Sequence, residues 1–270
     1  MRKIFTALIA LMILFLPLNT LAKSRDVIID GDHGKLSAVL QTPDDKVKYP
    51  LVILMHGFNA DKEHLLITSL ADELESRGIA SIRFDFNGHG KSDGTFQEMT
   101  IPNEINDARK VYKYVRNLRS VTTISAVGHS QGGVIAGMLA GELGANKIKR
   151  IVLMAPAEIL RDDALRGNLF RIKFDVKNPP ETLDIRGKCL IGRDYIVTLQ
   201  TLPIFETSEK FKGEALMIQG DNDTMVPYTS SLLYERIFKR GKVKIIKDAD
   251  HSFHGKESQV TKTAADFLSR

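Results

Sequence analysis

Residues 122–134 read TTISAVGHSQGGV, and this stretch decides the fold. Its first half is a short run rich in apolar and β-branched residues, which predicts a buried strand. Gly128, Ser130 and Gly132 then form the pattern G-x-S-x-G, and an apolar segment of helical length follows. A serine at such a strand-to-helix turn sits at the carboxyl edge of a parallel sheet with its hydroxyl presented to a ligand. The sequence therefore predicts Ser130 as a nucleophile.

Short apolar runs alternate with amphipathic segments on both sides of this turn. The predicted strands are 51–55, 79–84, 122–127, 148–154, 215–219 and 243–246, and the predicted helices are 63–77, 103–118, 134–143, 228–238 and 258–268. Strands that alternate with helices are typical of βαβ units and a parallel sheet. The predicted fold class is α/β, with a mostly parallel central sheet and helices on both faces.

The regular alternation stops between residues 156 and 212. This segment mixes polar and apolar residues and contains Pro179, Pro180 and Pro203. Because the alternation resumes afterwards, the segment is an insertion before the last strands of a single domain that covers residues 23–270. Connections of this length within a compact domain are usually functional. We expect the insertion to form a lid over the active site.

A serine hydroxyl needs a base, and the base needs an acid that orients it. His251 follows the last predicted strand and lies at the same sheet edge as Ser130, and His254 is the alternative. The acid is expected between the serine and the histidine in the chain. The preceding strand leads to Asp221 and Asp223, which compete for this role, and we favour Asp223. The predicted triad is Ser130, Asp223 and His251.

Two backbone amides are candidates for stabilising the oxyanion that forms when the serine attacks. The amide of Gln131 follows the nucleophile directly and opens a helix, whose N-terminus favours negative charge. The turn His56-Gly57-Phe58 follows an earlier central strand, and Gly57 allows a close backbone approach. We expect the amide of Phe58 to be the second donor.

The first 22 residues are typical of a secretory signal peptide. Arg2 and Lys3 precede an apolar run that Pro17 ends, and Ala22 closes a short segment of small and polar residues. The run is shorter than the roughly 20 apolar residues that a membrane-spanning helix needs. We expect cleavage after Ala22, no stable membrane insertion afterwards, and a periplasmic or secreted protein.

Charge and cysteine content exclude several other classes of protein. The formal net charge is +5, but Lys and Arg are scattered, so nucleic acid is not a predicted partner. Cys189 is the single cysteine, so an intrachain disulfide is impossible. The sequence calls for no metal and no organic cofactor, and it leaves a homodimer open.

Several motifs together resemble the bacterial cinnamoyl (feruloyl) esterases of the α/β-hydrolase superfamily. They are His56-Gly57-Phe58, Phe84-Asp85-Phe86-Asn87-Gly88-His89-Gly90, Ser92-Asp93-Gly94, Gly128-His129-Ser130-Gln131-Gly132-Gly133, Gly220-x-x-Asp223-x-x-Val226-Pro227, and two insertion segments, Asp163–Asn168 and Leu202–Glu206. The resemblance covers nearly the whole chain after residue 22. It implies an α/β-hydrolase fold with an inserted lid.

The resemblance also implies roles for particular residues. It assigns the same triad and the same two oxyanion donors as the residue-by-residue reasoning. It further implies that Asp163 and Tyr195, in the lid, bind the phenolic hydroxyl of the substrate. A glutamine that assists in some family members corresponds to Phe170 here, and the stretch 183–193 also departs from the family pattern.

The function expected from these observations is hydrolysis of hydroxycinnamate esters, either small molecules or esters linked to polysaccharide. The alternatives are a broad short-chain carboxylesterase, a monoglyceride-type lipase or a thioesterase, since the same triad serves all of them. An α/β-hydrolase domain that only binds ligands is a further alternative. The presence of all three triad residues argues against it.

Overall fold

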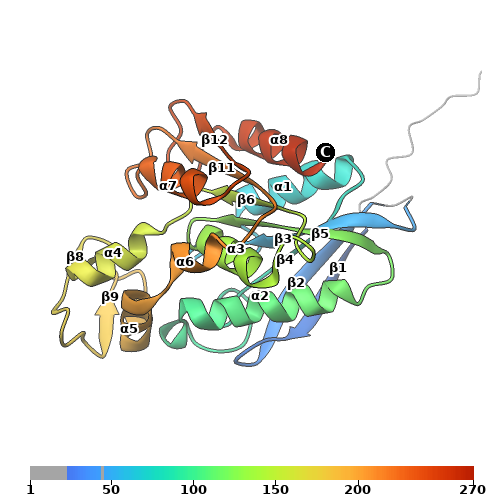
Figure 1. Cartoon of the computed structure of the whole chain (residues 1–270). Coiled ribbons are helices and arrows are strands. Elements are labelled where there is room, and N and C mark those ends of the chain that lie inside the picture. Colours follow the sequence, from blue (N-terminus) through green and yellow to red (C-terminus); the bar gives the residue numbers. More distant parts are fainter. Residues whose placement is uncertain (1–22, 44–45) are drawn as a thin grey trace, which may run out of the picture.

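The computed structural model describes residues 23–43 and 46–270, and the predicted signal peptide lies outside these residues. An eight-stranded sheet with the strand order β1-β2-β4-β3-β5-β6-β11-β12 forms its centre (Figure 1). The strands are β1 (Lys23–Asp30), β2 (Lys35–Thr42), β3 (Tyr49–Met55), β4 (Ala80–Phe84), β5 (Val121–His129), β6 (Arg150–Met154), β11 (Glu214–Gly220) and β12 (Gly241–Ile246).

The sheet is parallel from β4 to β12 and antiparallel where β1 pairs with β2 and β2 with β4. The prediction of a mostly parallel sheet is therefore confirmed. The inner strands β3, β5 and β6 are buried over most of their length, as expected for strands covered on both faces. The β1–β2 hairpin is an addition that the alternation of strands and helices did not predict.

Helices cover both faces of the sheet, as predicted. On one face α1 (Leu65–Ser76) packs beside α8 (Glu257–Leu268), and their apolar sides share one core with the sheet. On the other face lie α2 (Ile101–Arg116), α3 (Gln131–Leu143) and α7 (Thr229–Ile237), which belong to a second core. Figure 1 shows the sheet between α1 and α8 on one side and α2 and α3 on the other.

Helices α2 and α3 flank the predicted nucleophile, and local sequence sets where each begins. The Thr100 side chain accepts a hydrogen bond from the Asn103 amide (3.2 Å), which caps α2. Helix α3 begins directly after Ser130 and is apolar on nearly all sides, because it lies between the sheet and other helices.

The insertion between β6 and β11 lies to one side of the sheet, at the left of Figure 1. It contains α4 (Ile159–Arg166), the hairpin of β7 (Asn168–Leu169) and β8 (Ile172–Lys173), the hairpin of β9 (Thr182–Asp184) and β10 (Leu190–Gly192), α5 (Arg193–Thr201) and α6 (Ile204–Ser208). The short helix α6 packs on α3 so closely that a Cβ on Gly141 would lie 1.9 Å from the Thr207 carbonyl oxygen. Within residues 23–43 and 46–270, we find no helix with the length and apolar character needed to span a bilayer.

Candidate active site

The turn between β5 and α3 holds Ser130 in an unusual backbone conformation. Its φ of 55° and ψ of −120° lie outside the regions that a non-glycine residue normally adopts, and such strain costs of order 1–3 kcal/mol. The flanking glycines make the turn possible. A Cβ on Gly128 would lie 1.9 Å from the Gly132 carbonyl oxygen, and one on Gly132 would lie 2.3 Å from the His56 carbonyl oxygen. The serine hydroxyl is thereby presented at the carboxyl end of β5.

Two residues from distant parts of the chain meet this serine. His251 Nε2 lies 2.9 Å from Ser130 Oγ, and His251 Nδ1 lies 2.8 Å from Asp223 Oδ2. With Nδ1–H donating to the carboxylate, Nε2 is free to accept the serine proton. The structure thus brings together the three residues predicted as the triad, in the arrangement of a nucleophile, a base and an orienting acid.

The Asp223 carboxylate is held by several donors. Its Oδ1 accepts hydrogen bonds from the amides of Met225 (2.8 Å) and Val226 (2.9 Å), and its Oδ2 accepts one from Gln219 Nε2 (2.8 Å). Burial alone would raise the pKa of Asp223. The hydrogen bonds from His251 and from the two amides outweigh burial and keep the pKa below its ordinary value. Asp223 is therefore ionised near neutral pH.

The two alternatives that the sequence left open lie outside this hydrogen-bonded arrangement. Asp221 is exposed and accepts a hydrogen bond from the Asp248 amide (2.6 Å). His254 is exposed and pairs with Asp250, with 2.7 Å between Nδ1 and Oδ2. Neither side chain contacts Ser130 or His251 through a hydrogen bond in the described part of the chain.

His129 is a part of the site that the sequence analysis did not predict. Its Nε2 lies 2.9 Å from the carbonyl oxygen of His251. Burial, reinforced by the neighbouring His251, lowers the pKa of His129 to about 3, so the ring is neutral and donates this hydrogen bond through Nε2–H. His129 therefore fixes the backbone of the catalytic base. The only sequence signal was its position between the elbow glycine and the serine.

The Phe58 amide lies in a turn that is fixed by a buried histidine. The Phe86 amide donates to His56 Nε2 (3.2 Å), which leaves His56 Nδ1–H to donate to the Gly57 carbonyl (2.8 Å). That carbonyl belongs to the same peptide group as the Phe58 N–H, so its orientation sets the direction of the N–H. A Cβ on Gly57 would lie 3.0 Å from Ser130 Cβ, which shows how near this peptide lies to the nucleophile.

The Gln131 amide is fixed in a similar way by the carbonyl of its own peptide group. The Ser130 carbonyl accepts hydrogen bonds from the amides of Gly133 (2.9 Å), Val134 (3.3 Å) and Ala157 (3.1 Å). Gln131 is the first residue of α3, and the first amides of a helix have no partner within it. The predicted oxyanion donors, Phe58 and Gln131, therefore belong to two restrained peptide groups beside the nucleophile.

A buried ion pair supports the loop that carries Phe58. Lys62 Nζ lies 2.6 Å from Asp85 Oδ2, and both side chains are at most 5% exposed. The Asp85 carboxylate also accepts hydrogen bonds from the amides of Lys62 (2.7 Å) and Lys91 (2.8 Å). The Asp85–Gly94 motif thus connects the loop after β4 to the loop after β3.

Comparison with known proteins identifies the family. A family model described as serine aminopeptidase (Hydrolase_4) matches residues 48–172, which include the nucleophile turn. Est1E from Butyrivibrio proteoclasticus, whose structure has ferulic acid bound, is 32% identical in sequence to this chain. The two structures match with a TM-score of 0.86 over 90% of this chain and 97% of that chain. The chain belongs to the cinnamoyl/feruloyl esterase-like family of the α/β-hydrolases.

More distant relatives share the fold. The Pyrococcus furiosus esterase Pf2001 is 21% identical, with a TM-score of 0.70 over 92% of this chain and 93% of that one. The quorum-quenching protein AidA of Acinetobacter baumannii is 26% identical over 134 residues, which are 48% of this chain and 43% of that protein. The chain thus aligns with less than half of this curated relative's length. Membership of the esterase-like family makes this protein a carboxylic ester hydrolase of the serine type.

The two residues predicted to bind substrate, Asp163 and Tyr195, lie in the insertion. Asp163, on α4, is partly exposed, and partial burial raises its pKa above the ordinary value. Tyr195, on α5, has no exposed surface, and its hydroxyl donates to Gln131 Oε1 (2.6 Å). In this conformation the Tyr195 hydroxyl is occupied, so its contact with a substrate stays a prediction that requires local opening.

Aromatic rings surround the oxyanion loop of this esterase-like protein. The Phe170 ring lies 4.4 Å from the Phe58 ring, centroid to centroid, and Phe96 and Tyr195 lie 5.3 and 5.9 Å from it. Phe58, Phe96 and Phe170 are partly exposed, whereas Tyr195 lies beneath them. Phe170 therefore contributes to an apolar wall beside Phe58, whose amide is a predicted oxyanion donor.

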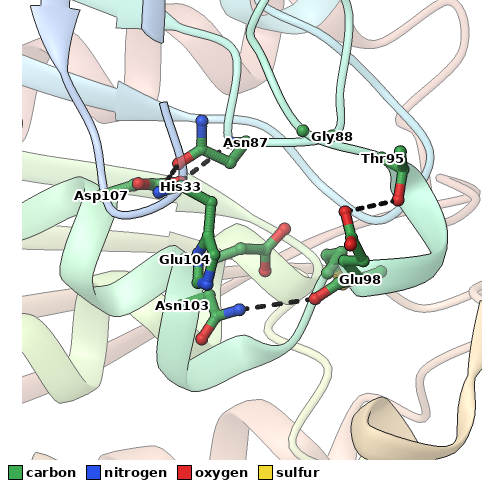
Figure 2. A pocket seen from close by; sticks show the side chains of 10 residues that line it. His33, Asn87, Gly88, Thr95, Glu98, Asn103, Glu104 and Asp107 are labelled. Carbon is green, nitrogen blue, oxygen red and sulfur yellow. Dashed lines mark hydrogen bonds between the residues drawn. The ribbon is translucent and has the colours of Figure 1, made fainter. Parts of the chain in front are cut away.

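A small cavity lies next to α2 and is lined mainly by polar residues (Figure 2). Its volume of about 10 Å³ is near the least that admits one water molecule. Glu104 and Asp107 line it from α2, and Asn87 and His33 line it from two loops. Within residues 23–43 and 46–270, no group of three or more His, Cys, Asp or Glu side chains is placed to hold a metal ion.

Proposed function

We propose that the protein hydrolyses hydroxycinnamate esters through an acyl-enzyme on Ser130. His251 takes the proton from Ser130 Oγ as the oxygen attacks the ester carbonyl, and it then protonates the leaving alcohol. The amides of Phe58 and Gln131 stabilise the oxyanion, and Asp223 stabilises the imidazolium that forms. Water, activated by the same histidine, then releases the carboxylic acid and regenerates the serine.

The observation that carries this proposal is the contact between Phe170 and Phe58. The backbone amide of Phe58 is a predicted oxyanion donor, so the ring of the same residue begins an apolar wall beside the ester carbonyl that reacts. A planar conjugated acyl group such as a cinnamoyl group can pack against aromatic rings in this position. The similarity to Est1E with bound ferulic acid supports the same substrate class.

We further propose that Asp163 and Tyr195 bind the phenolic hydroxyl of the substrate. A carboxylate accepts a hydrogen bond from a phenol, and a tyrosine hydroxyl can donate or accept one. Asp163 is the accessible member of the pair, because the Tyr195 hydroxyl is bonded to Gln131. Tyr195 would have to exchange this partner for the substrate.

A broad carboxylesterase is the second candidate function. It is favoured by the same Tyr195–Gln131 hydrogen bond and by Phe170, because both reduce the number of polar groups available to read a phenol. The two functions differ in their response to the phenolic hydroxyl. The test is to compare kcat/KM for methyl ferulate, methyl cinnamate and 4-nitrophenyl acetate. Equal values for the two methyl esters would favour the broad carboxylesterase.

We propose in addition that the protein is exported and acts in the periplasm or outside the cell. The charged start, the apolar run and Ala22 motivate this proposal. Intact-mass measurement on natively expressed protein tests it, with a mature N-terminus at Lys23 as the expected result. A full-length mass in the cytoplasmic fraction would overturn it.

A further inference from the structure

The Gln131 side chain belongs to a buried hydrogen-bond chain that the proposed reaction does not use. Its Nε2 donates to Glu104 Oε2 (2.6 Å), and its Oε1 accepts from the Tyr195 hydroxyl (2.6 Å). All three side chains are at most 2% exposed. Since they come from α2, α3 and α5, the chain connects the insertion and a helix on the sheet to the residue that follows the nucleophile.

Glu104 is an unusual partner for a buried amide because it has no strong cation beside it. Within the described residues, His89 is the one basic side chain at ion-pair distance, with its Nε2 3.9 Å from Glu104 Oε1, and no Lys or Arg pairs with Glu104. His33 lines the same small cavity as Glu104. Burial lowers the pKa of His89, so this ring is neutral at neutral pH.

The remaining neighbours also favour an uncharged Glu104. Burial raises the pKa of Glu104 well above its ordinary value; the hydrogen bond from Gln131 opposes this rise and the charge of Asp107 adds to it. An ionised carboxylate without a cation is costly in such a place. A protonated carboxyl group still offers a carbonyl oxygen that accepts the Gln131 hydrogen bond.

We propose that Glu104 is a positioning residue for the oxyanion hole: by holding the Gln131 side chain, it fixes the direction of the Gln131 backbone amide. The amide must lie about 2.7–3.1 Å from the oxyanion to stabilise it. The side chain of Gln131 is anchored at both its polar atoms, so its Cα has little freedom to tilt. A site of this kind depends on the residues that support its donors.

The inference rests on the proposed ester hydrolysis through Ser130 but not on the hydroxycinnamate substrate. Its test therefore uses 4-nitrophenyl acetate, a substrate for serine esterases in general. Loss of one oxyanion donor typically lowers kcat by about 10²–10³-fold, and a tilted donor should cost part of that. Glu104→Ala should lower kcat by about 10–100-fold with little change in KM, because the donor acts mainly in the transition state.

Two further variants separate positioning from folding. Glu104→Gln keeps an acceptor oxygen for Gln131 and should recover kcat to within about three-fold of wild type. Asp107→Ala is the matched control, since Asp107 is also buried on α2 but accepts hydrogen bonds from the backbone amides of Asn87 (Figure 2) and of Asp32. It should lower Tm without lowering kcat.

A Gln131→Met variant keeps the test valid if Glu104→Ala does not fold. It removes both side-chain hydrogen bonds and keeps a similar volume, and the residue still has a backbone amide that can donate to the oxyanion. It should reproduce the loss in kcat, and adding Glu104→Ala should lower kcat no further, because the two residues act in one chain.

Three results would overturn the inference. The first is a kcat within two-fold of wild type in both Glu104→Ala and Gln131→Met. The second is a Glu104→Gln variant as slow as Glu104→Ala, and the third is losses in kcat that multiply when Glu104→Ala and Gln131→Met are combined. If wild-type protein cleaves 4-nitrophenyl acetate but not methyl ferulate, the proposed substrate fails while this inference can still be tested.

Discussion

The sheet edge that carries the triad and the insertion beside it are held by different kinds of contact. Around the triad, backbone amides hold the Asp223 carboxylate, and the neutral His129 ring holds the His251 carbonyl. In the insertion, the ion pairs are exposed, as between Arg161 and Glu206. The difference indicates that polar contacts fix the reacting groups, whereas the insertion is held mainly by the apolar side chains that it buries in the core.

The insertion contacts the triad region mainly near the predicted oxyanion donors, Phe58 and Gln131. The Ala157 amide, at the start of the insertion, donates to the Ser130 carbonyl, and Phe170 packs on Phe58. On the acid side, Arg171 donates to the Thr224 carbonyl (3.0 Å) from an exposed position. Phe170 and Arg171 form the turn of the β7–β8 hairpin, and both have positive φ, which is costly for residues with side chains. Through this one strained turn, the insertion therefore contacts both Phe58, next to the nucleophile, and Thr224, next to the triad acid.

The largest effect should come from removing the nucleophile, which breaks the chemistry and leaves the insertion untouched. Ser130→Ala should lower kcat by about 10⁴–10⁶-fold, the usual range for the loss of a triad serine. Turnover of 4-nitrophenyl acetate and labelling by a fluorophosphonate measure the loss, and a thermal melt controls for folding. More than a tenth of wild-type activity in a folded variant would contradict the assignment.

The triad acid should come next. Asp223→Asn removes the charge that orients the His251 ring, and the comparable change in a known triad lowers kcat by about 10⁴-fold. Asp221→Asn is the matched control two residues away, and it should stay within a few-fold of wild type because Asp221 binds only a backbone amide. The reverse order of effects would mean that the wrong aspartate has been chosen.

The sequence could predict the parts of this site that follow a local pattern. The G-x-S-x-G turn, the strand ends and the position of His251 near the last strand can each be recognised from a few consecutive residues. The inner strands and α3 were predicted from short, nearly continuous apolar runs, and helices such as α1 from the regular spacing of their buried residues. The β1–β2 hairpin was missed because β1 is an edge strand with largely exposed residues and an apolar run of only three residues, Val27–Ile29.

The support behind the site could not be predicted in this way. The partners Glu104 and Gln131, or Lys62 and Asp85, are far apart in the chain and belong to different elements. Nothing periodic links such pairs, and a buried carboxylate looks like a surface residue in a sequence. For Tyr195, the resemblance suggested a substrate ligand, whereas the structure shows a hydroxyl bonded to Gln131.

Stability should respond differently to ion pairs in the two regions. Lys62→Met leaves the charge of Asp85 buried without its partner, and breaking a buried pair typically costs about 3–5 kcal/mol of unfolding free energy. Arg161→Ala breaks the exposed Arg161–Glu206 pair of the insertion and should cost at most about 1 kcal/mol. Urea denaturation measures both. Similar losses would mean that the insertion is fixed as firmly as the sheet.

The pH dependence of stability should show the titration of Glu158, which lies at the start of the insertion. Burial raises the pKa of Glu158 to about 7. Because the folded state holds this proton more tightly than the unfolded state, the unfolding free energy should fall as pH rises from about 4.5 to about 7.

Replacing Glu158 removes this titration. Glu158→Gln should be more stable than wild type at pH 8 by up to about 2–3 kcal/mol, with a much smaller difference at pH 5. Urea denaturation at both pH values measures the change. Glu206→Gln, at an exposed position of the insertion, is the control and should leave the pH dependence nearly unchanged. An equal difference at pH 5 and pH 8 would show that Glu158 does not titrate in this range.

The smallest predicted effect concerns substrate choice. It tests whether a residue of the insertion binds the phenolic hydroxyl of the substrate. If Asp163 accepts the phenolic hydroxyl, a substrate without it leaves a polar group unsatisfied, at a cost of about 1–3 kcal/mol. Wild-type protein should then prefer methyl ferulate to methyl cinnamate by roughly ten-fold or more in kcat/KM. Asp163→Ala should bring this ratio close to one.

The matched control for this test is the neighbouring residue on the same helix. Asp162 is exposed and pairs with Arg166 (3.5 Å), so Asp162→Ala should keep the preference for methyl ferulate. Turnover of 4-nitrophenyl acetate should stay within about two-fold in both variants, because neither residue touches the triad. A preference that survives Asp163→Ala would place the reading of the hydroxyl elsewhere, with Tyr195 the next residue to test. Its hydroxyl would then have to leave Gln131 when the substrate binds, so that substrate choice and the oxyanion donor would be coupled through one side chain.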